Sequence, residues 1–179
     1  MKTYFILSAI GRDRPGIVAE VSEVIYECGG NIEDSSMSVL RNHFALLLLF
    51  STEREEVNQR LSTQLKRLEW EKGLTVFYSP ISFEQAYPKR KEETDPFKIT
   101  TSGVDHAGIV YKLSRLLADR GINIADMKTH RILSAESGTP LFDMDIDIDV
   151  PRSVSEEGLR EGLHGLADEL VIDLVFKKC

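Results

Sequence analysis

The sequence predicts an α+β protein made of two modules, each a four-stranded antiparallel sheet with two helices packed on one face. Three observations support this fold class. The two halves of the chain repeat one sequence motif. In each half, the apolar residues follow the spacing of strand, helix, strand, strand, helix and strand in turn. A polar segment without regular apolar spacing separates the halves.

The internal repeat is the strongest of these observations. When the chain is displaced by 92 positions, Gly11 falls on Gly103, and ten residues match without a gap. Ungapped identities in so short a stretch indicate two copies of one structural unit. We place these copies at residues 1–82 and 96–179. The matching residues of the first half are Gly11, Asp13, Gly16, Ile17, Val18, Ser22, Gly29, Asn31, Ile32 and Asp34.

The elements of the first module follow from apolar spacing and from its turn residues. A first helix is predicted at residues 15–28, because Pro15 suits a first helical turn and Gly29 a helix end. A second helix is predicted at residues 55–70. Its apolar face consists of Val57, Leu61, Leu65 and Leu68. The strands are predicted at residues 3–10, 32–40, 44–51 and 74–81.

The second module repeats this order, which is the split βαβ pattern of the ferredoxin-like fold. Residues 83–95 are predicted to link the modules, because they hold Pro88, a charge run and few apolar residues. The basic cluster at residues 89–91 is followed by two glutamates, which favours a solvated segment. In the second module, strands are predicted at 97–102, 123–134, 141–150 and 170–177, and helices at 109–120 and 155–166.

Composition excludes several classes of protein. The 179 residues are 42% hydrophobic and 28% charged, which is typical of a globular protein. The chain contains no uncharged apolar run of about 18 residues, so we expect no membrane segment. We see no secretory signal, and two cysteines favour reduced thiols in the cytoplasm. The net charge of −7 disfavours direct binding to nucleic acid.

The turn between the first strand and the first helix is the part of each module that the repeat keeps best. It spans residues 11–18 and 103–110. Such a turn presents unpaired backbone N–H groups at a helix N-terminus, where a carboxylate can bind. The glycines at positions 16 and 108 allow the backbone to approach a ligand closely. The alternative is that Asp13 and Asp105 cap the helices and that the glycines only form the turn.

These turns and the residues that follow the helix resemble the ACT domain family. The pattern Asp-x-Pro-Gly-Ile-Val stands at residues 13–18, and Gly-x-Asn-Ile enters the next strand at residues 29–32. Both patterns recur at residues 105–110 and 121–124, with Ala107 in place of the usual proline. Two such modules in tandem resemble the glycine cleavage system transcriptional repressor group.

The resemblance implies that modules pair side by side, as in a dimer, and that an amino acid such as glycine or serine binds at the seam. The turn of one module then faces the helix end and second strand of its neighbour. An asparagine amide both donates and accepts, which suits an ammonium or carboxylate group. A turn role for each asparagine is the alternative. The implied ligand-binding residues are Asp13, Arg14, Pro15, Gly16, Ile17, Val18 and Asn31, and Asp105, His106, Ala107, Gly108, Ile109, Val110 and Asn123.

Catalytic, metal and cofactor sites are not expected. The four histidines lack metal-ligand spacing, and no phosphate-binding loop or nucleophile motif occurs. Aspartates alternate with apolar residues from Asp143 to Asp149 and therefore share one strand face. Same-face neighbours lie roughly 7 Å apart, too far to converge on one ion. This strand predicts an open, solvated sheet face.

The corresponding strand of the first module is apolar on both faces. Ala45, Leu47 and Leu49 stand where the second module has aspartates. The helices cover one face only, so we expect these residues to contact the second module, another copy of the chain or a target protein.

The sequence therefore predicts a non-enzymatic regulatory protein that binds an amino acid and acts through a protein partner, in transcriptional control of amino-acid metabolism. One alternative is an interaction module that binds no ligand. Another is nucleic-acid binding on the sheet, which would require exposed aromatic residues and a basic surface. The acidic strand and the net charge argue against it.

Overall fold

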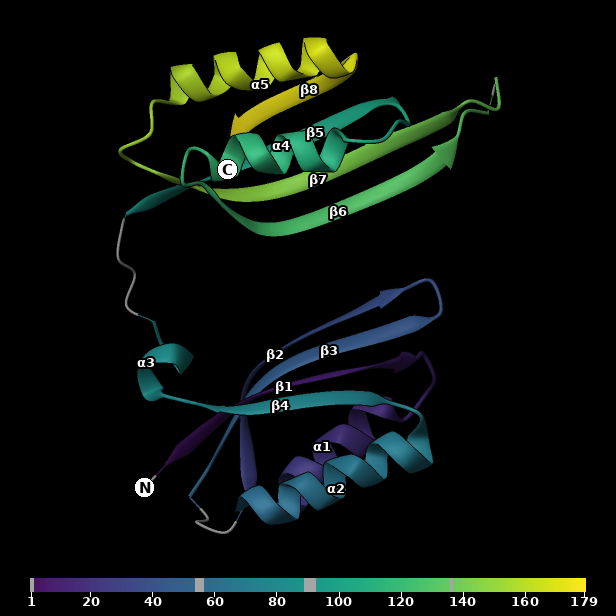
Figure 1. Cartoon of the computed structure of the whole chain (residues 1–179), viewed down its shortest axis with the longest axis vertical. Helices are drawn as coiled ribbons and strands as arrows, with labels where there is room; N and C mark the ends of the chain where they lie inside the picture. The colour runs from purple at the N-terminus through teal and green to yellow at the C-terminus, as the bar shows by residue number, and fades with distance from the viewer. Residues whose placement is uncertain (1, 54–56, 89–92, 136) are drawn as a thin grey trace. The chain divides into compact units, whose positions relative to one another are not determined.

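The computed structural model describes residues 2–53, 57–88, 93–135 and 137–179 (Figure 1). The chain divides into two compact units, Met1–Lys89 and Arg90–Cys179. Each unit has the order βαββαβ and a four-stranded antiparallel sheet, so the predicted fold class is confirmed. The helices that follow the first and third strands of each unit cover one face of its sheet, as Figure 1 shows.

Unit 1 has the strand order β2-β3-β1-β4, which leaves β2 and β4 as the edge strands. A short helix, α3, follows the last strand. The elements are β1 (Thr3–Arg12), α1 (Ile17–Glu27), β2 (Gly30–Leu40), β3 (His43–Thr52), α2 (Val57–Lys72), β4 (Thr75–Ile81) and α3 (Phe83–Ala86).

Unit 2 has the matching strand order β6-β7-β5-β8. Its elements are β5 (Thr94–Val104), α4 (Ile109–Ala118), β6 (Asn123–Leu133), β7 (Pro140–Pro151), α5 (Glu156–Leu170) and β8 (Ile172–Lys178). The repeat extends to an irregularity in the sheet. The pairing of β2 with β3 shifts register between Ile32 and Asp34, and that of β6 with β7 shifts between Ile124 and Asp126.

Apolar side chains from the helices and one sheet face form a separate core in each unit. The predicted face of α2, from Val57 to Leu68, is buried. Within the first core, Phe5 stacks on Phe50 with ring centroids 5.1 Å apart. Such burial, rather than helix propensity, supplies most of the stability of these short helices.

Several boundaries differ from the sequence predictions. Helix α1 begins at Ile17 and not at Pro15, because Gly16 has a φ of 94°, a left-handed conformation that a helix cannot include. The segment 83–95, predicted as a linker, contains α3 and the start of β5. The basic cluster at residues 89–91 lies outside the described residues, and so do residues 55 and 56 of the predicted second helix. The division at 82 and 96 remains a proposal.

Candidate functional site

The turn before the first helix has the same backbone geometry in both units. The residue at the N-cap of α1 is Gly16, and that of α4 is Gly108, with φ values of 94° and 103°. Within the described chain, no side chain caps either helix. The interpretation of Asp13 and Asp105 as capping residues is therefore wrong, because a left-handed glycine takes the capping position.

Each turn is held in place through its backbone. The N–H of Asp13 donates to the carbonyl oxygen of Asn42, and that of Asp105 to the carbonyl oxygen of Pro140, both at 2.9 Å. The first N–H groups of a helix have no acceptor within the helix. Since no side chain takes this role, the amides at the start of α1 and α4 are available to an anion such as a carboxylate.

The Arg14 side chain connects the first turn to helix α1, and through Glu20 to the end of α2. Its guanidinium donates to both carboxylate oxygens of Glu20, at 3.0 and 2.6 Å. Lys72, at the end of α2, lies 3.4 Å from the same carboxylate. The hydrogen bonds from Arg14, followed by that from Lys72, hold the pKa of Glu20 below its ordinary value. The Arg14–Glu20 pair therefore links the turn to α1, while the Arg14 side chain stays partly exposed.

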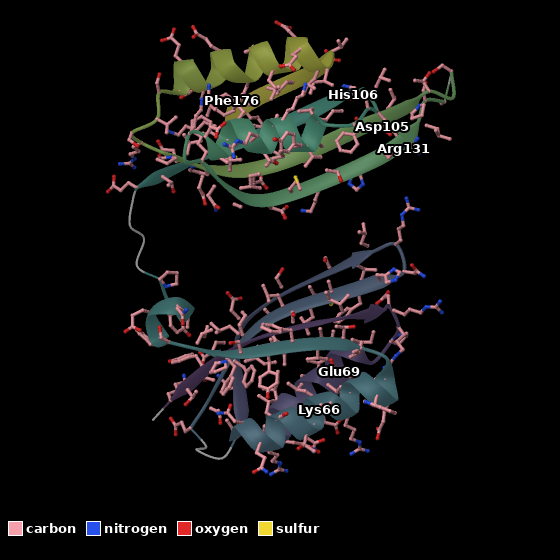
Figure 2. All side chains as sticks on the ribbon, viewed as in Figure 1. Lys66, Glu69, Asp105, His106, Arg131 and Phe176 are labelled. Atoms are coloured by element: carbon pink, nitrogen blue, oxygen red, sulfur yellow. The ribbon has the colours of Figure 1, made fainter. Side chains whose placement is uncertain are left out.

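The second turn is held in place by other side-chain contacts, made by His106 and Asp105 (Figure 2). The Nε2 atom of His106 lies 2.9 Å from the carbonyl oxygen of Leu170, at the end of α5. Arg131, on β6, donates from Nε to the Asp105 carboxylate at 2.5 Å. In unit 1, Val39 stands at the position equivalent to Arg131, so Asp13 lacks this cation. Asp13 is exposed.

The two asparagines lie in strands, so the turn interpretation is wrong. Asn31 is the second residue of β2 and Asn123 the first of β6, and both are exposed. Asn31 lies near the C-terminal end of α1, whereas the turn lies at its N-terminal end. An 11-residue helix is about 16 Å long. One unit therefore does not bring its own turn and asparagine to a single small ligand.

An open groove runs along the exposed side of α1 to the start of β2. Its walls include Ala19, Ser22, Tyr26, Asn31 and Ile32. Tyr26 and Ile32 are large apolar residues that remain exposed. Asn31 thus stands in a partly apolar groove beside the edge of the sheet.

The sheet faces opposite the helices differ between the units. In β3, Leu47 is exposed, and Ala45 and Leu49 are half-buried. In β7, the four aspartates lie on the corresponding open face, as predicted. Thr100 donates to Asp145 at 3.0 Å.

Two observations bear on other kinds of site. Among the described residues, no group of three or more histidine, cysteine, aspartate or glutamate side chains could hold a metal ion. In the same part of the chain, no helix is both long enough and apolar enough to span a membrane.

Sequence reasoning did not find the residues that hold the turns. Leu170 is 64 positions from His106 along the chain, and Arg131 is 26 positions from Asp105. Glu20 is six positions from Arg14, which is not a helical spacing. Contacts of this kind depend on the folded arrangement and leave no local pattern.

Known proteins are similar to this chain in sequence and in fold. Residues 3–79 match the family model described as the ACT domain. A UPF0237 protein of Methanopyrus kandleri is 40% identical over 75 residues, which cover 41% of this chain and 83% of that protein.

Two further similarities involve proteins named for gene regulation. The glycine cleavage system transcriptional repressor of Escherichia coli (strain K12) is 42% identical over 48 residues, 27% of this chain and 25% of that protein. The fold also matches a crystal structure of a protein proposed to be a glycine cleavage system transcriptional repressor. That match has a TM-score of 0.74 and 22% identity, over 100% of this chain and 98% of the other. At this identity the likeness concerns the fold.

Proposed function

Because the chain belongs to the ACT domain family, we propose that it is a regulatory protein that binds a free amino acid and catalyses no reaction. Glycine and serine are the first candidate ligands. The protein acts in the cytoplasm through a protein partner and takes part in transcriptional control of amino-acid metabolism. The similarity to a protein named as a transcriptional repressor supports this role.

The observation that carries the proposal is the uncapped helix N-terminus behind Gly16 and Gly108. An amino acid carries a carboxylate, which the free helix amides can accept together with the positive end of the helix dipole. It also carries an ammonium group, which needs an acceptor such as the amide oxygen of Asn31 or the carboxylate of Asp13.

The separation of turn and asparagine favours a site made by two modules. If two modules pair antiparallel along their β2 or β6 edges, the turn of one lies beside the asparagine of the other. The exposed edge strands have unpaired backbone groups that suit such pairing. The ligand would then act by stabilising the pair, because it contacts both members.

If the first units of two copies pair, the site formed by the turn of one and Asn31 of the other should bind more tightly than the corresponding site around Asn123 in a pair of second units. In unit 2, Arg131 forms an ion pair with Asp105, whereas Val39 stands at the equivalent position in unit 1 and Asp13 is exposed to a ligand ammonium. Unit 1 also has Pro15 in the turn, which restricts the backbone before binding.

Isothermal titration calorimetry with a panel of amino acids tests the proposal. A hydrogen bond to a charged group contributes about 1.5–3 kcal/mol. Asn31→Ala should therefore raise the dissociation constant for the bound amino acid roughly 10- to 100-fold, and Asn123→Ala should raise it less. Asn58→Ala, an exposed asparagine on α2, is the matched control and should leave binding unchanged.

Two outcomes would contradict the proposal. If no amino acid binds at millimolar concentration, the sensor role is excluded. If an amino acid binds but the Asn31 and Asn58 variants bind it equally well, the ligand occupies a different place.

An interaction module without a ligand is the second candidate. The exposed Leu47 between half-buried Ala45 and Leu49 favours it, because an apolar strand face suits protein contact. A calorimetric panel without heat, together with stable self-association or partner binding, would favour this candidate over the sensor.

A further inference from the structure

The open sheet face of unit 1 carries a band of exposed apolar side chains. In the strand register, Phe77, Ser8, Leu47 and Ser36 stand side by side across all four strands. Ile10 projects in the neighbouring row. Phe77 is 65% exposed, and Ile10 and Leu47 are each 50% exposed. The helices lie on the other face and do not cover this band (Figure 1).

Helix α3 extends this band at one end of the sheet. Tyr4 alternates with the buried Phe5 and so lies on the open face, where its ring contacts Phe83 and Tyr87 at centroid distances of 5.8 and 5.7 Å. The hydroxyl of Tyr87 donates to Glu33 at 3.2 Å. Phe83 remains 58% exposed and Tyr87 43% exposed. The short helix is therefore fixed to unit 1 and adds to its apolar surface.

The size of this surface fits an interface. Aromatic side chains present about 150–250 Å² each. With Ile10 and Leu47 taken at a similar size, the exposed fractions of Phe77, Phe83, Tyr87, Ile10 and Leu47 correspond to roughly 500 Å². That value is near the upper end of the largest patch on a typical monomer, about 300–600 Å². It is more than half of the roughly 800 Å² that each partner contributes to a standard interface.

The charges on the face restrict what can cover it. Asp34, at the β2 edge, is the one charged residue in the three rows that contain Ile6, Ser8 and Ile10. A phosphate backbone or an anionic membrane requires cations that these rows lack. The open face of unit 2 is unsuitable too, because Asp145 would be buried against apolar side chains.

The shape of the face is complementary to itself. The bulky Phe77 lies on the edge strand β4, and the small Ser36 and Ser38 lie on the opposite edge strand, β2. A two-fold axis parallel to the strands places β4 of one copy over β2 of the other. Each phenyl ring then meets hydroxyl-bearing small residues, while the apolar centres pack together.

We propose that two copies of the chain associate by packing the open faces of their first units against each other, with α3 at the rim. This interface does not involve the ligand turn or Asn31. The proposal therefore goes beyond amino-acid binding, and either can fail without the other.

Sedimentation velocity and light scattering of the full chain provide the first test. The wild type should have twice the chain mass of 20.2 kDa. Leu47→Asp and Phe77→Asp should weaken the dimer roughly 100-fold or more, because each places a carboxylate in an apolar interface, and the circular dichroism spectrum should be unchanged. Leu47→Asp introduces the residue that unit 2 carries at the same position, Asp145, and Ser8 can donate to it as Thr100 does.

Val175→Asp is the matched control. Val175 pairs with Thr100 as Phe77 pairs with Ser8, and it is 58% exposed on the open face of unit 2. This variant should keep the wild-type mass. A monomeric wild type at about 100 μM, a concentration well above the micromolar range of specific association, would overturn the proposal. Equal masses for the wild type and the Leu47 and Phe77 variants would overturn it as well.

Cross-linking tests the interface in a second way, by forming a link across it and not by weakening the dimer. In a Cys179→Ser background, Ser36→Cys and Phe77→Cys together should be joined between chains by a short bismaleimide cross-linker, because sheets that pack face to face lie about 10 Å apart. Within one chain these positions lie on strands about 14 Å apart, beyond the reach of the same linker. Mass spectrometry should find the two cysteine peptides joined in the dimer. A wild-type dimer whose cysteine variant gives no such link would overturn the proposed face.

Discussion

Two glycine-to-alanine substitutions in unit 2 should change stability in opposite directions. Gly108 caps α4 with a φ of 103°, and Gly165 lies inside α5 with ordinary helical geometry. A Cβ atom added at either position meets nothing within 4 Å. Packing is therefore the same in both cases, and any difference reports the backbone conformation alone.

The expected magnitudes follow from this geometry. A side chain in the left-handed region costs about 1–2 kcal/mol, so Gly108→Ala should destabilise unit 2 by that amount. Alanine in a helix interior is roughly 0.5–1 kcal/mol better than glycine, so Gly165→Ala should stabilise the same unit. The two variants should differ by about 1.5–3 kcal/mol in free energy of unfolding. For a domain of this size, 1 kcal/mol shifts Tm by about 4–8 °C.

Urea unfolding followed by circular dichroism measures both variants, and hydrogen exchange assigns the change to unit 2. A Gly108→Ala protein as stable as the Gly165→Ala protein would refute the reasoning. Equal stability would mean that residue 108 relaxes to negative φ without a cost in free energy of unfolding. The amides at the start of α4 would then not be held in the conformation described. Gly16→Ala in unit 1, with a φ of 94° and an equally open Cβ position, should reproduce the loss.

Two further predictions concern single side chains. Thr101 buries an Oγ1 atom that has no hydrogen-bond partner within the described chain, and the equivalent residue in unit 1 is Ala9. Thr101→Val should leave the free energy of unfolding unchanged or raise it by about 1 kcal/mol in urea titrations; a comparable loss would show that the hydroxyl is bonded. Hydrogen bonds from Lys2, then Ser51, hold the pKa of Glu33 at about 2, against an ordinary 4.5. Since the folded pKa is depressed, its stabilising effect is present above pH 4.5 and is lost as the pH falls towards 2. Glu33→Gln should therefore flatten the pH dependence of unit 1 stability in that window, and an unchanged slope would exclude this role.

The elements and their order were predictable because each is encoded by local spacing. The α2 residues from Val57 to Leu68 recur at helical spacing and are buried against the sheet. The four aspartates of β7 alternate with apolar residues, and this spacing alone predicts that they share one face. The repeat of Gly16 at Gly108 indicated two copies of one turn.

Other features could not be predicted because they depend on contacts between distant residues or on backbone conformation. The left-handed φ of Gly16 leaves no pattern that separates it from an ordinary turn glycine, so the sequence predicts a helix start two residues before Ile17. Helix α3 is a single turn whose position depends on the contact of Tyr4 with Phe83 and Tyr87. The pairing of Asp105 with Arg131 requires β6 to reach the turn.

The two units share one backbone fold, but several neighbouring residues on their open sheet faces differ together. Asp145 is tolerated in unit 2 because Thr100 donates to it and Lys98 lies between it and Asp147. In unit 1, the position of Lys98 is taken by Ile6, which offers no charge to an acidic neighbour.

A single substitution in either direction leaves a charge without its partner or an apolar group among charges. Replacing only some of these residues is therefore unfavourable, because the residues on each face are compatible with one another. A solvated acidic face favours solubility. The face around Leu47 lacks the favourable free energy of burial as long as it is exposed to water. Since both faces rest on the same fold, stability of the fold does not require the apolar one. The apolar face is best explained by an association in which it is covered.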